Sequence, residues 1–178
     1  MSAEWEEIID EHRRKARQIS FRILVWGPSA QDSTGYQLRM TIRDHLASNG
    51  HSAKFSEELI TEGKVKPAPN PIHDETIHAT VADLILVLYQ SRGTQTEVDK
   101  ILSASDLARK AIVVVGETTW NHLMQSVSRF QWENFRGAIL KLPDHQFDNS
   151  HICSKLDEVV ENLQFTEYID RLKSKLSV

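Results

Sequence analysis

The stretch DLILVLY at residues 83–89 is apolar at every position between its first and last residues. It shows no alternation of apolar and polar side chains, so the strand that it predicts would be buried on both faces. Strands of this kind are typical of parallel sheets that are covered by helices on both sides. We therefore predict that residues 83–89 form a central strand of a parallel sheet.

Further strand candidates alternate with amphipathic segments on both sides of this stretch. Shorter apolar runs predict strands at residues 21–26, 51–55, 111–115 and 137–142. Helical spacing predicts helices at residues 4–18, 36–48, 73–81, 94–108 and 150–176, with helix and loop mixed at 119–135. This alternation is typical of βαβ units. The predicted fold is α/β and flavodoxin-like: a doubly wound, mainly parallel five-stranded sheet with helices on both faces.

The length of 178 residues is that of one domain of ordinary size. We predict an N-terminal helix at residues 1–20 and an α/β domain at residues 21–145. A C-terminal helical segment at residues 146–178 is expected to pack on the same domain. The terminal segments carry more apolar residues than one small sheet needs. We therefore expect a homo-oligomer or a partner protein.

The charge balance argues against a protein that binds nucleic acid directly. The chain has 21 Lys and Arg against 25 Asp and Glu, whereas nucleic-acid binders usually carry a basic excess. No apolar run approaches the roughly 18 residues of a membrane span. Residues 1–20 lack the pattern of a signal peptide. We therefore expect a soluble, cytoplasmic protein with no membrane partner.

Cysteine and histidine usage argues against disulfides and metal centres. Cys153 is the only cysteine, which excludes a disulfide framework and fits a reducing cytoplasm. It lies in an amphipathic segment, where we expect a core thiol instead of a nucleophile. His73 and His78 are five residues apart, which matches no common metal motif. We predict neither a metal nor a cofactor.

Doubly wound sheets bind ligands beyond the carboxyl ends of their strands, where the strand order reverses. After the first predicted strand, Gly27 and Pro28 form a turn whose glycine would let a ligand approach the backbone closely. An ordinary strand-ending turn explains the same two residues equally well. The sequence contains neither a dinucleotide fingerprint nor a Walker loop at this position.

A second motif follows the strand at residues 83–89. Thr94 and Glu97 have the spacing of a capping box at the start of a helix. The alternative is functional, because a carboxylate in this first helical turn would point into the ligand crevice. There it would act as a nucleophile or an ion-pairing group at the anomeric carbon of a sugar.

Several other polar residues are candidates at the same edge. Tyr36 and Arg39, near the start of the first crossover helix, would hold a ribose or a phosphate, and Arg92 would pair with a phosphate. For both arginines, an ordinary surface charge is the alternative. For Asp83 we expect a cap on the preceding turn. The residues predicted to bind substrate are Gly27, Pro28, Tyr36, Arg39, Ser91, Arg92, Gly93 and Thr94.

The order of these motifs resembles the nucleoside 2-deoxyribosyltransferase family. The resemblance covers residues 21–116 and rests on Gly-Pro after the first strand, a Leu-x-x-x-Gly close to the next helix, an Ala-Asp strand start and a Gly-Thr-x-x-Glu loop. In this sequence these motifs are Gly27-Pro28, residues 46–50, Ala82-Asp83 and residues 93–97. The architecture is also similar to that of TIR-like NAD-cleaving domains and of lysine-decarboxylase-like nucleotide-binding domains.

The resemblance implies a catalytic role for Glu97, which would attack C1′ and displace the base. Asp74 would then assist the leaving base as proton donor. The family carries an Asp six residues before its nucleophile, and Ser91 stands there in this chain. Because a hydroxyl cannot do the work of a carboxylate, base loss would be hydrolytic, or the substrate would be a nucleotide or NAD.

Three functions follow as expectations from these residues. The first is an enzyme that cleaves or transfers an N-glycosidic bond of a nucleoside, nucleotide or NAD, in the manner of stand-alone relatives that look like effectors of bacterial defence systems. The second is a catalytically silent module that senses a nucleotide in the same crevice, which Ser91 favours. The third is an interaction subunit whose terminal helices dock a partner protein.

Overall fold

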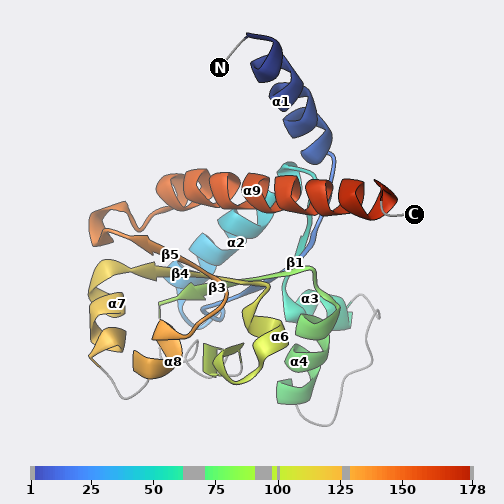
Figure 1. Ribbon diagram of the computed structural model, residues 1–178. Coiled ribbons are helices and arrows are strands. Elements are labelled where there is room, and N and C mark those ends of the chain that lie inside the picture. Colours follow the sequence, from blue (N-terminus) through green and yellow to red (C-terminus); the bar gives the residue numbers. More distant parts are fainter. Residues whose placement is uncertain (1–2, 62–70, 91–97, 100, 126–128, 177–178) are drawn as a thin grey trace. The chain divides into compact units, whose positions relative to one another are not determined.

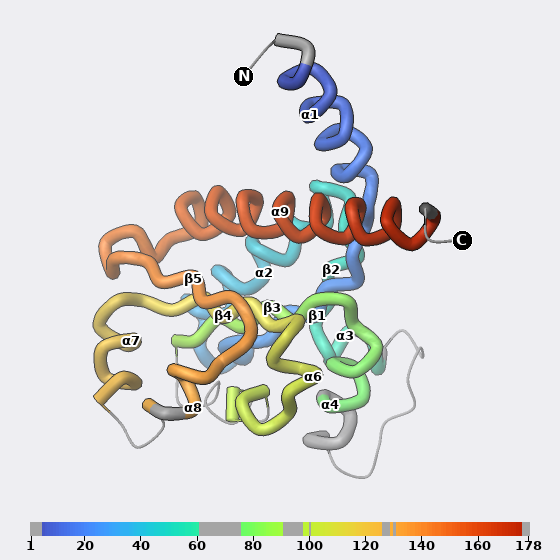
Figure 2. Tube along the Cα trace, viewed as in Figure 1, coloured from blue at the N-terminus to red at the C-terminus, as the bar shows by residue number. Residues whose placement is uncertain are grey.

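The computed structural model describes residues 3–61, 71–90, 98–99, 101–125 and 129–176. Figures 1 and 2 trace the chain through alternating strands and helices. The strands are β1 (Arg22–Trp26), β2 (Ser52–Lys54), β3 (Leu84–Tyr89), β4 (Ala111–Gly116) and β5 (Ala138–Leu142). The helices are α1 (Ala3–Ala16), α2 (Ser33–Ser48), α3 (Ser56–Thr61), α4 (Pro71–Val81), α6 (Ser105–Ala108), α7 (Glu117–Met124), α8 (Arg129–Glu133) and α9 (Asn149–Leu176), with a short 3₁₀ turn at Asp144–Gln146.

The five strands form one sheet in the order β2-β1-β3-β4-β5. Every neighbouring pair is parallel, as in the pairing of Ile23 with Leu84 and of Ile85 with Ala111. Figure 1 shows α2 on one side of this sheet and α4 and α6 on the other. The predicted doubly wound α/β fold with a flavodoxin-like strand order is confirmed.

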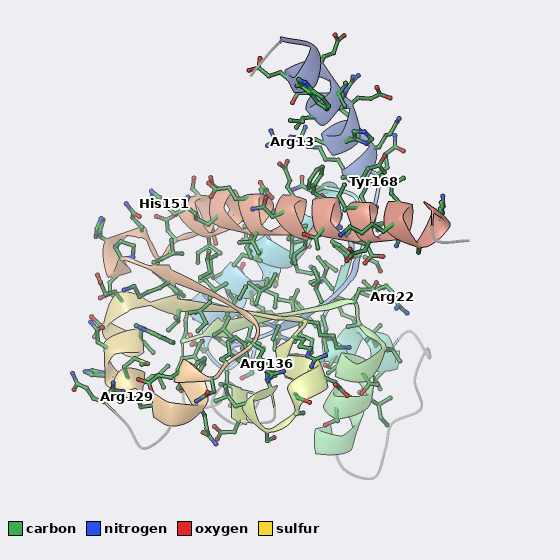
Figure 3. All side chains as sticks on the ribbon, in the orientation of Figure 1. Arg13, Arg22, Arg129, Arg136, His151 and Tyr168 are labelled. Carbon is green, nitrogen blue, oxygen red and sulfur yellow. The ribbon has the colours of Figure 1, made fainter. Side chains whose placement is uncertain are left out.

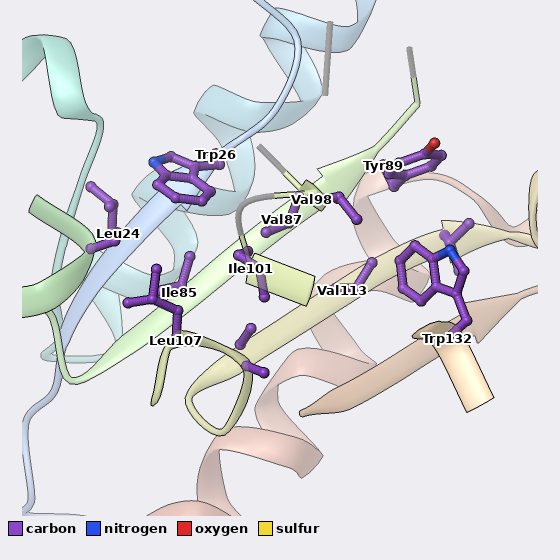
Figure 4. Packing of buried hydrophobic residues seen from close by; sticks show 14 residues of the cluster. Leu24, Trp26, Ile85, Val87, Tyr89, Val98, Ile101, Leu107, Val113 and Trp132 are labelled. Atoms are coloured by element: carbon purple, nitrogen blue, oxygen red, sulfur yellow. The ribbon is translucent and has the colours of Figure 1, made fainter. Parts of the chain in front are cut away.

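The core lies on both faces of the central strands. All six residues of β3 and all six of β4 are buried, as the apolar run at 83–89 predicts. On the face of α4 and α6, Leu24, Trp26 and Val87 belong to one buried cluster with Ile101 from the chain after β3 (Figure 4). Tyr89 and Trp132 meet edge to face in this cluster, with ring centroids 6.2 Å apart.

The helices predicted at 4–18, 73–81 and 150–176 differ from the described bounds by one or two residues, and two other predictions differ more. α2 begins at Ser33, before the predicted start at residue 36, because the Asp32 carboxylate accepts a hydrogen bond from the backbone N–H of Gly35 (3.1 Å). The helix predicted at 94–108 is interrupted at Ala104, whose backbone is extended; its first residues, 94–97, lie outside the described residues. Ile101 and Leu107 are both buried in the cluster, although six residues of continuous helix would turn them about 120° apart.

The described chain divides into two compact units. One consists of Phe21–Ile152, and the other joins Met1–Ser20 to Cys153–Val178. Within the second unit, the buried Gln164 side chain donates from Nε2 to the carbonyl oxygen of Ile19 at 2.7 Å. His12 Nδ1 and the hydroxyl of Tyr168 lie 3.0 Å apart (Figure 3). The two ends of the chain therefore fold against each other.

The apolar face predicted for the N-terminal helix is largely exposed. Trp5 keeps 61% of its surface accessible and Ile8 keeps 40%. Cys153, by contrast, is buried and unbridged, as expected for a core thiol. No helix in the described part of the chain is both long and apolar enough to cross a membrane.

Asp83 joins the beginnings of β1 and β3, so the prediction that it caps the preceding turn is wrong. Its carboxylate accepts hydrogen bonds from the backbone N–H of Arg22 (2.8 Å) and from Nε and Nη2 of the same residue (3.0 and 2.6 Å). Figure 3 labels Arg22 at this end of the sheet. Sequence reasoning missed the pair because the two residues become neighbours only when β1 and β3 align.

We expect Asp83→Asn to lower the free energy of unfolding by about 1 kcal/mol at neutral pH, because the contact is charge-assisted but partly exposed. The hydrogen bonds from Arg22 hold the pKa of Asp83 below its usual range. The stabilisation is therefore complete above about pH 5 and is lost as the pH falls through the pKa of the folded state. Urea unfolding of both proteins at a series of pH values measures it. A difference that persists undiminished in strong acid would contradict this explanation.

Candidate functional site

The strand order places the candidate site at one edge of the sheet. β1 lies between β2 and β3, so the chain reverses its direction of winding between β1 and β3. α2 follows β1 on one side of the sheet, whereas α4 and α6 lie on the other side (Figure 1). In doubly wound folds this reversal opens a crevice beyond the carboxyl ends of the two strands.

A shallow groove of about 530 Å³ lies at this reversal. Three stretches form it: the first turns of α2, the residue after β3, and the segment that leads into α9. The lining residues are Ser33, Thr34, Gln37, Leu38, Gln90, Phe147, Asp148 and Asn149. Leu38 and Phe147 give the groove apolar surface, and the other side chains offer hydroxyl, amide and carboxylate groups. Such a mixture suits a flat polar ligand with several hydrogen-bonding groups.

The turn after β1 is held close to β3. Gly27 has a φ of +153°, and a Cβ on this residue would lie 3.0 Å from the Cβ of Leu88. A side chain at this position would therefore be strained and would press against β3. The glycine predicted to admit a ligand thus serves the packing of the strands, and its neighbour Pro28 is buried beside it.

Arg39 is the main support of this turn. Its Nε and Nη2 donate to the carbonyl oxygen of Val25 at 3.2 and 2.9 Å, and Nη1 donates to that of Pro28 at 3.5 Å. Nη1 and Nη2 also bond the two carboxylate oxygens of Glu57 at 3.1 and 3.2 Å. The guanidinium stands 4.1 Å from the ring centroid of Phe55. All of its nitrogens therefore bond protein acceptors, and the side chain is 4% exposed.

Tyr36, like Arg39, lies close to the ring of Phe55. Its ring centroid is 6.0 Å from that of Phe55, and the residue is half-buried. Neither Tyr36 nor Arg39 is among the described residues that line the groove. Their predicted contact with ribose or phosphate therefore stays a prediction, although the described bonds of Arg39 are all with protein groups. Arg39, through its bonds to the carbonyl oxygens of Val25 and Pro28, holds the turn that precedes α2.

The remaining predicted residues fall largely outside the described portion of the chain. Ser91, Arg92, Gly93, Thr94 and Glu97 all lie there. Gln90, which directly precedes them, lines the groove.

Asp74 belongs to the first turn of α4, but its side chain is outside the described residues. Because α4 leads into the beginning of β3, its own first turn lies toward the carboxyl edge of the sheet.

Sequence reasoning missed the acidic residues after β5. The Asp148 carboxylate accepts a hydrogen bond from the backbone N–H of His151 (3.0 Å) and pairs with its Nδ1 (2.8 Å). Figure 3 labels His151 near the start of α9. These hydrogen bonds, the backbone bond foremost, lower the pKa of Asp148, so the groove holds a carboxylate that is ionised at neutral pH. The signal was available, because Asp148 also follows the carboxyl end of a predicted strand.

Asp144 has a related role earlier in the same segment. Its carboxylate accepts from the hydroxyl of Thr118 and from the backbone N–H of the same residue. The hydroxyl bond is the main reason why the pKa of Asp144 is lowered. The contact ties the segment after β5 to the first turn of α7.

The described residues contain no cluster of three or more His, Cys, Asp or Glu side chains that could hold a metal ion. Comparison with known proteins adds no family: no family model matches the chain, and no curated protein matches its sequence.

Proposed function

We propose that the chain cleaves or transfers the N-glycosidic bond of a nucleoside, a nucleotide or NAD in the groove beyond β1 and β3. One observation carries the proposal. Gln90 lines the groove at the reversal of strand order, and the segment with Glu97 follows it directly in the chain. In the proposed mechanism the carboxylate of Glu97 reaches this groove and attacks the sugar carbon.

The chemistry assigns a role to each group. An oxygen of Glu97 forms a bond to C1′ while the C1′–N bond breaks, and the base leaves with the electron pair. A purine or pyrimidine takes a proton from Asp74 or water, whereas the nicotinamide of NAD leaves as a neutral molecule and needs none. Water or a second base then attacks C1′ and releases the Glu97 carboxylate. Gln37 and Gln90 lie in the groove with amides that both donate and accept, which suits the edge of a base. Asp148 and the hydroxyls of Ser33 and Thr34 suit the sugar.

A catalytically silent nucleotide-binding subunit is the second candidate. The observation that favours it is Ser91, which stands where the family that the chain resembles has a carboxylate.

The exposed Trp5 and Ile8 of α1 favour association with a second copy or a partner protein. We propose a cytoplasmic setting, in which Cys153 stays reduced, and a role as effector in a bacterial defence system.

A chromatographic screen tests the proposed reaction. The purified chain is incubated with NAD, nucleosides and their mono- and triphosphates, and the release of free base is followed. Release from any of these substrates establishes glycosidic cleavage and names its substrate class. Binding of a nucleotide without release identifies the silent subunit. If the chain alone neither binds any of these compounds nor releases a base from them, both proposals are contradicted.

A bulky side chain in the groove should block this reaction. Thr34 is exposed and lines the groove from the first turn of α2, so we expect Thr34→Trp to slow base release at least about tenfold, a loss of about 1.4 kcal/mol of transition-state stabilisation. Thr41→Trp is the matched control, because Thr41 is exposed on the same helix and does not line the groove. Both variants should unfold at the same temperature as the wild type. Equal rates for the two variants would place the reaction elsewhere.

A further inference from the structure

Helix α1 presents a large aromatic side chain to solvent. Trp5 is 61% exposed, and the first turns of α1 stand away from α9 (Figures 1 and 2). The contacts described between the two helices lie toward the end of α1, where Ala16 is buried and His12 meets Tyr168. α1 has 14 residues, and helices of this length are marginal in water unless another surface packs on them. The first half of α1 therefore lacks the packing that would stabilise it.

The same two helices form a groove of about 490 Å³, which we call the α1–α9 groove. Ile9 and Ala16 of α1 and Phe165 of α9 give it apolar surface, and Arg13 is one of its charged lining residues. Trp5 is not among the described residues that line it, although it lies one turn before Ile9. A cavity of about 150 Å³ already holds a benzene ring, so the α1–α9 groove has room for an indole.

The charges of α1 are segregated along its length. The acidic side chains come first and the basic ones last: Glu6, Glu7, Asp10 and Glu11 precede Arg13, Arg14, Lys15 and Arg17. Lys15 is paired with Glu11, and Arg17 with Glu161. Glu6 and Arg13 form no ion pair with any residue that the structure describes. Two such helices attract each other when they run in opposite directions, because the acidic half of each then meets the basic half of the other.

The opposite orientation also brings the indole to the groove. Trp5, Ile9 and Arg13 (labelled in Figure 3) follow one another at intervals of four residues, so they lie along one side of α1. When two copies cross at Ile9, Trp5 of each copy lies beside Arg13 of the other, because both residues are four positions from the crossing. The Arg13 guanidinium then stacks on the indole and is within reach of Glu6. The contact occurs twice, as a two-fold axis requires.

We propose that two copies of this chain form a dimer through antiparallel α1 helices, with Trp5 of each copy in the α1–α9 groove of the other. The proposal rests on the association that the exposed side chains of α1 favour, and it names the partner as a second copy. It is independent of the glycosidic reaction, in which α1 takes no part. A pair of short helices buries a small interface, so we expect a dissociation constant in the micromolar range.

Analytical ultracentrifugation of the whole chain, from about 1 to about 200 μM, tests this proposal. We expect a transition from monomer to dimer over this range. Trp5→Ser should raise the dissociation constant at least about tenfold, because buried aromatic side chains contribute most to such interfaces. Ile77→Ser is the matched control, since Ile77 is 48% exposed on α4 and belongs to the other unit. A monomer at every concentration, or a dimer that Trp5→Ser leaves intact, would overturn the proposal.

Charge reversal tests the antiparallel direction. Arg13→Glu should weaken the dimer at least about fivefold, because it brings two carboxylates together at each of the two contacts. Adding Glu6→Arg in the same chain should restore the affinity to within about threefold of the wild type, since each contact again joins opposite charges. Circular dichroism shows whether α1 stays helical in both variants. A doubly substituted chain that is helical but dimerises no better than Arg13→Glu would contradict the antiparallel pairing.

A cysteine at the crossing point tests the register. In the proposed dimer Ile9 lies next to Ile9 of the other copy, so Ile9→Cys should form an intermolecular disulfide on oxidation. Glu7→Cys is the control, because two residues along a helix turn the side chain about 160° away. Equal cross-linking by the two variants would overturn the proposal. These experiments do not measure the release of free base, so a dimer without turnover would contradict the proposed reaction alone, and an active monomer would contradict the dimer alone.

Discussion

Replacing Arg39 by methionine is expected to lower the free energy of unfolding by about 3 kcal/mol. Methionine keeps most of the aliphatic stem but leaves the buried carbonyl oxygens of Val25 and Pro28 without the bonds that the guanidinium donates. It also removes the cation that stacks on Phe55. Urea unfolding at neutral pH measures the change. If the slope of the unfolding free energy against urea concentration is unaltered, the substitution has not affected the unfolded state.

Glu57→Gln is the matched control for this prediction. Glu57 contributes the other half of the ion pair, but its side chain is 63% exposed. Exposed ion pairs contribute little, so we expect a loss below about 1 kcal/mol. Equal losses for the two variants would mean that the ion pair, and not the bonds to the turn, stabilises this region. A stable Arg39→Met protein that has lost only its affinity for phosphate-bearing substrates would restore the role predicted from the sequence.

The sheet was predictable because its central strands are buried on both faces and consist of apolar residues. Residues 84–88 and 111–115 are apolar without alternation, and β3 and β4 are indeed buried at every position. The break at Ala104 was not predictable in the same way. Alanine favours helix, and no glycine or proline marks the interruption. Only the joint burial of Ile101 and Leu107 against the sheet explains it.

The location of the candidate groove follows from the sequence more directly than the residues that line it. The rule that ligands bind beyond the carboxyl ends of strands leads to the groove, because it depends on topology alone. The role of Arg39 depends on partners elsewhere in the chain, among them Glu57 and the carbonyl of Val25. Charged residues on helices are usually exposed, so the pattern around Arg39 gave no sign of burial. Asp148 reaches the groove only because β5 ends beside β4 in the folded sheet.

Glu97→Gln is expected to reduce the release of free base at least about a thousandfold, because a nucleophile that forms a covalent intermediate cannot be replaced by a neutral amide. The substitution is informative because glutamine also serves at the third position of a capping box. A purely structural Glu97 would therefore tolerate it, with activity and stability both preserved. Glu97→Ala should in addition lower the free energy of unfolding, by about 1 kcal/mol, if the capping box also forms.

Glu117→Gln is the control that tests whether the reaction takes place at the end of β3 or at the end of β4. Glu117 also lies in the first turn of a helix that follows a parallel strand, and its carboxylate is half exposed, 3.7 Å from Lys141 Nζ. We expect the turnover of the Glu117→Gln variant to stay within about twofold of the wild type, since an exposed ion pair of this kind contributes little.

A substrate analogue with fluorine at C2′ should accumulate a glycosyl ester on Glu97, because fluorine slows hydrolysis of the intermediate. Mass spectrometry of the peptides would detect this ester. An ester on Glu117, or loss of turnover in Glu117→Gln alone, would move the chemistry to the end of β4, away from the reversal of strand order on which the proposal rests.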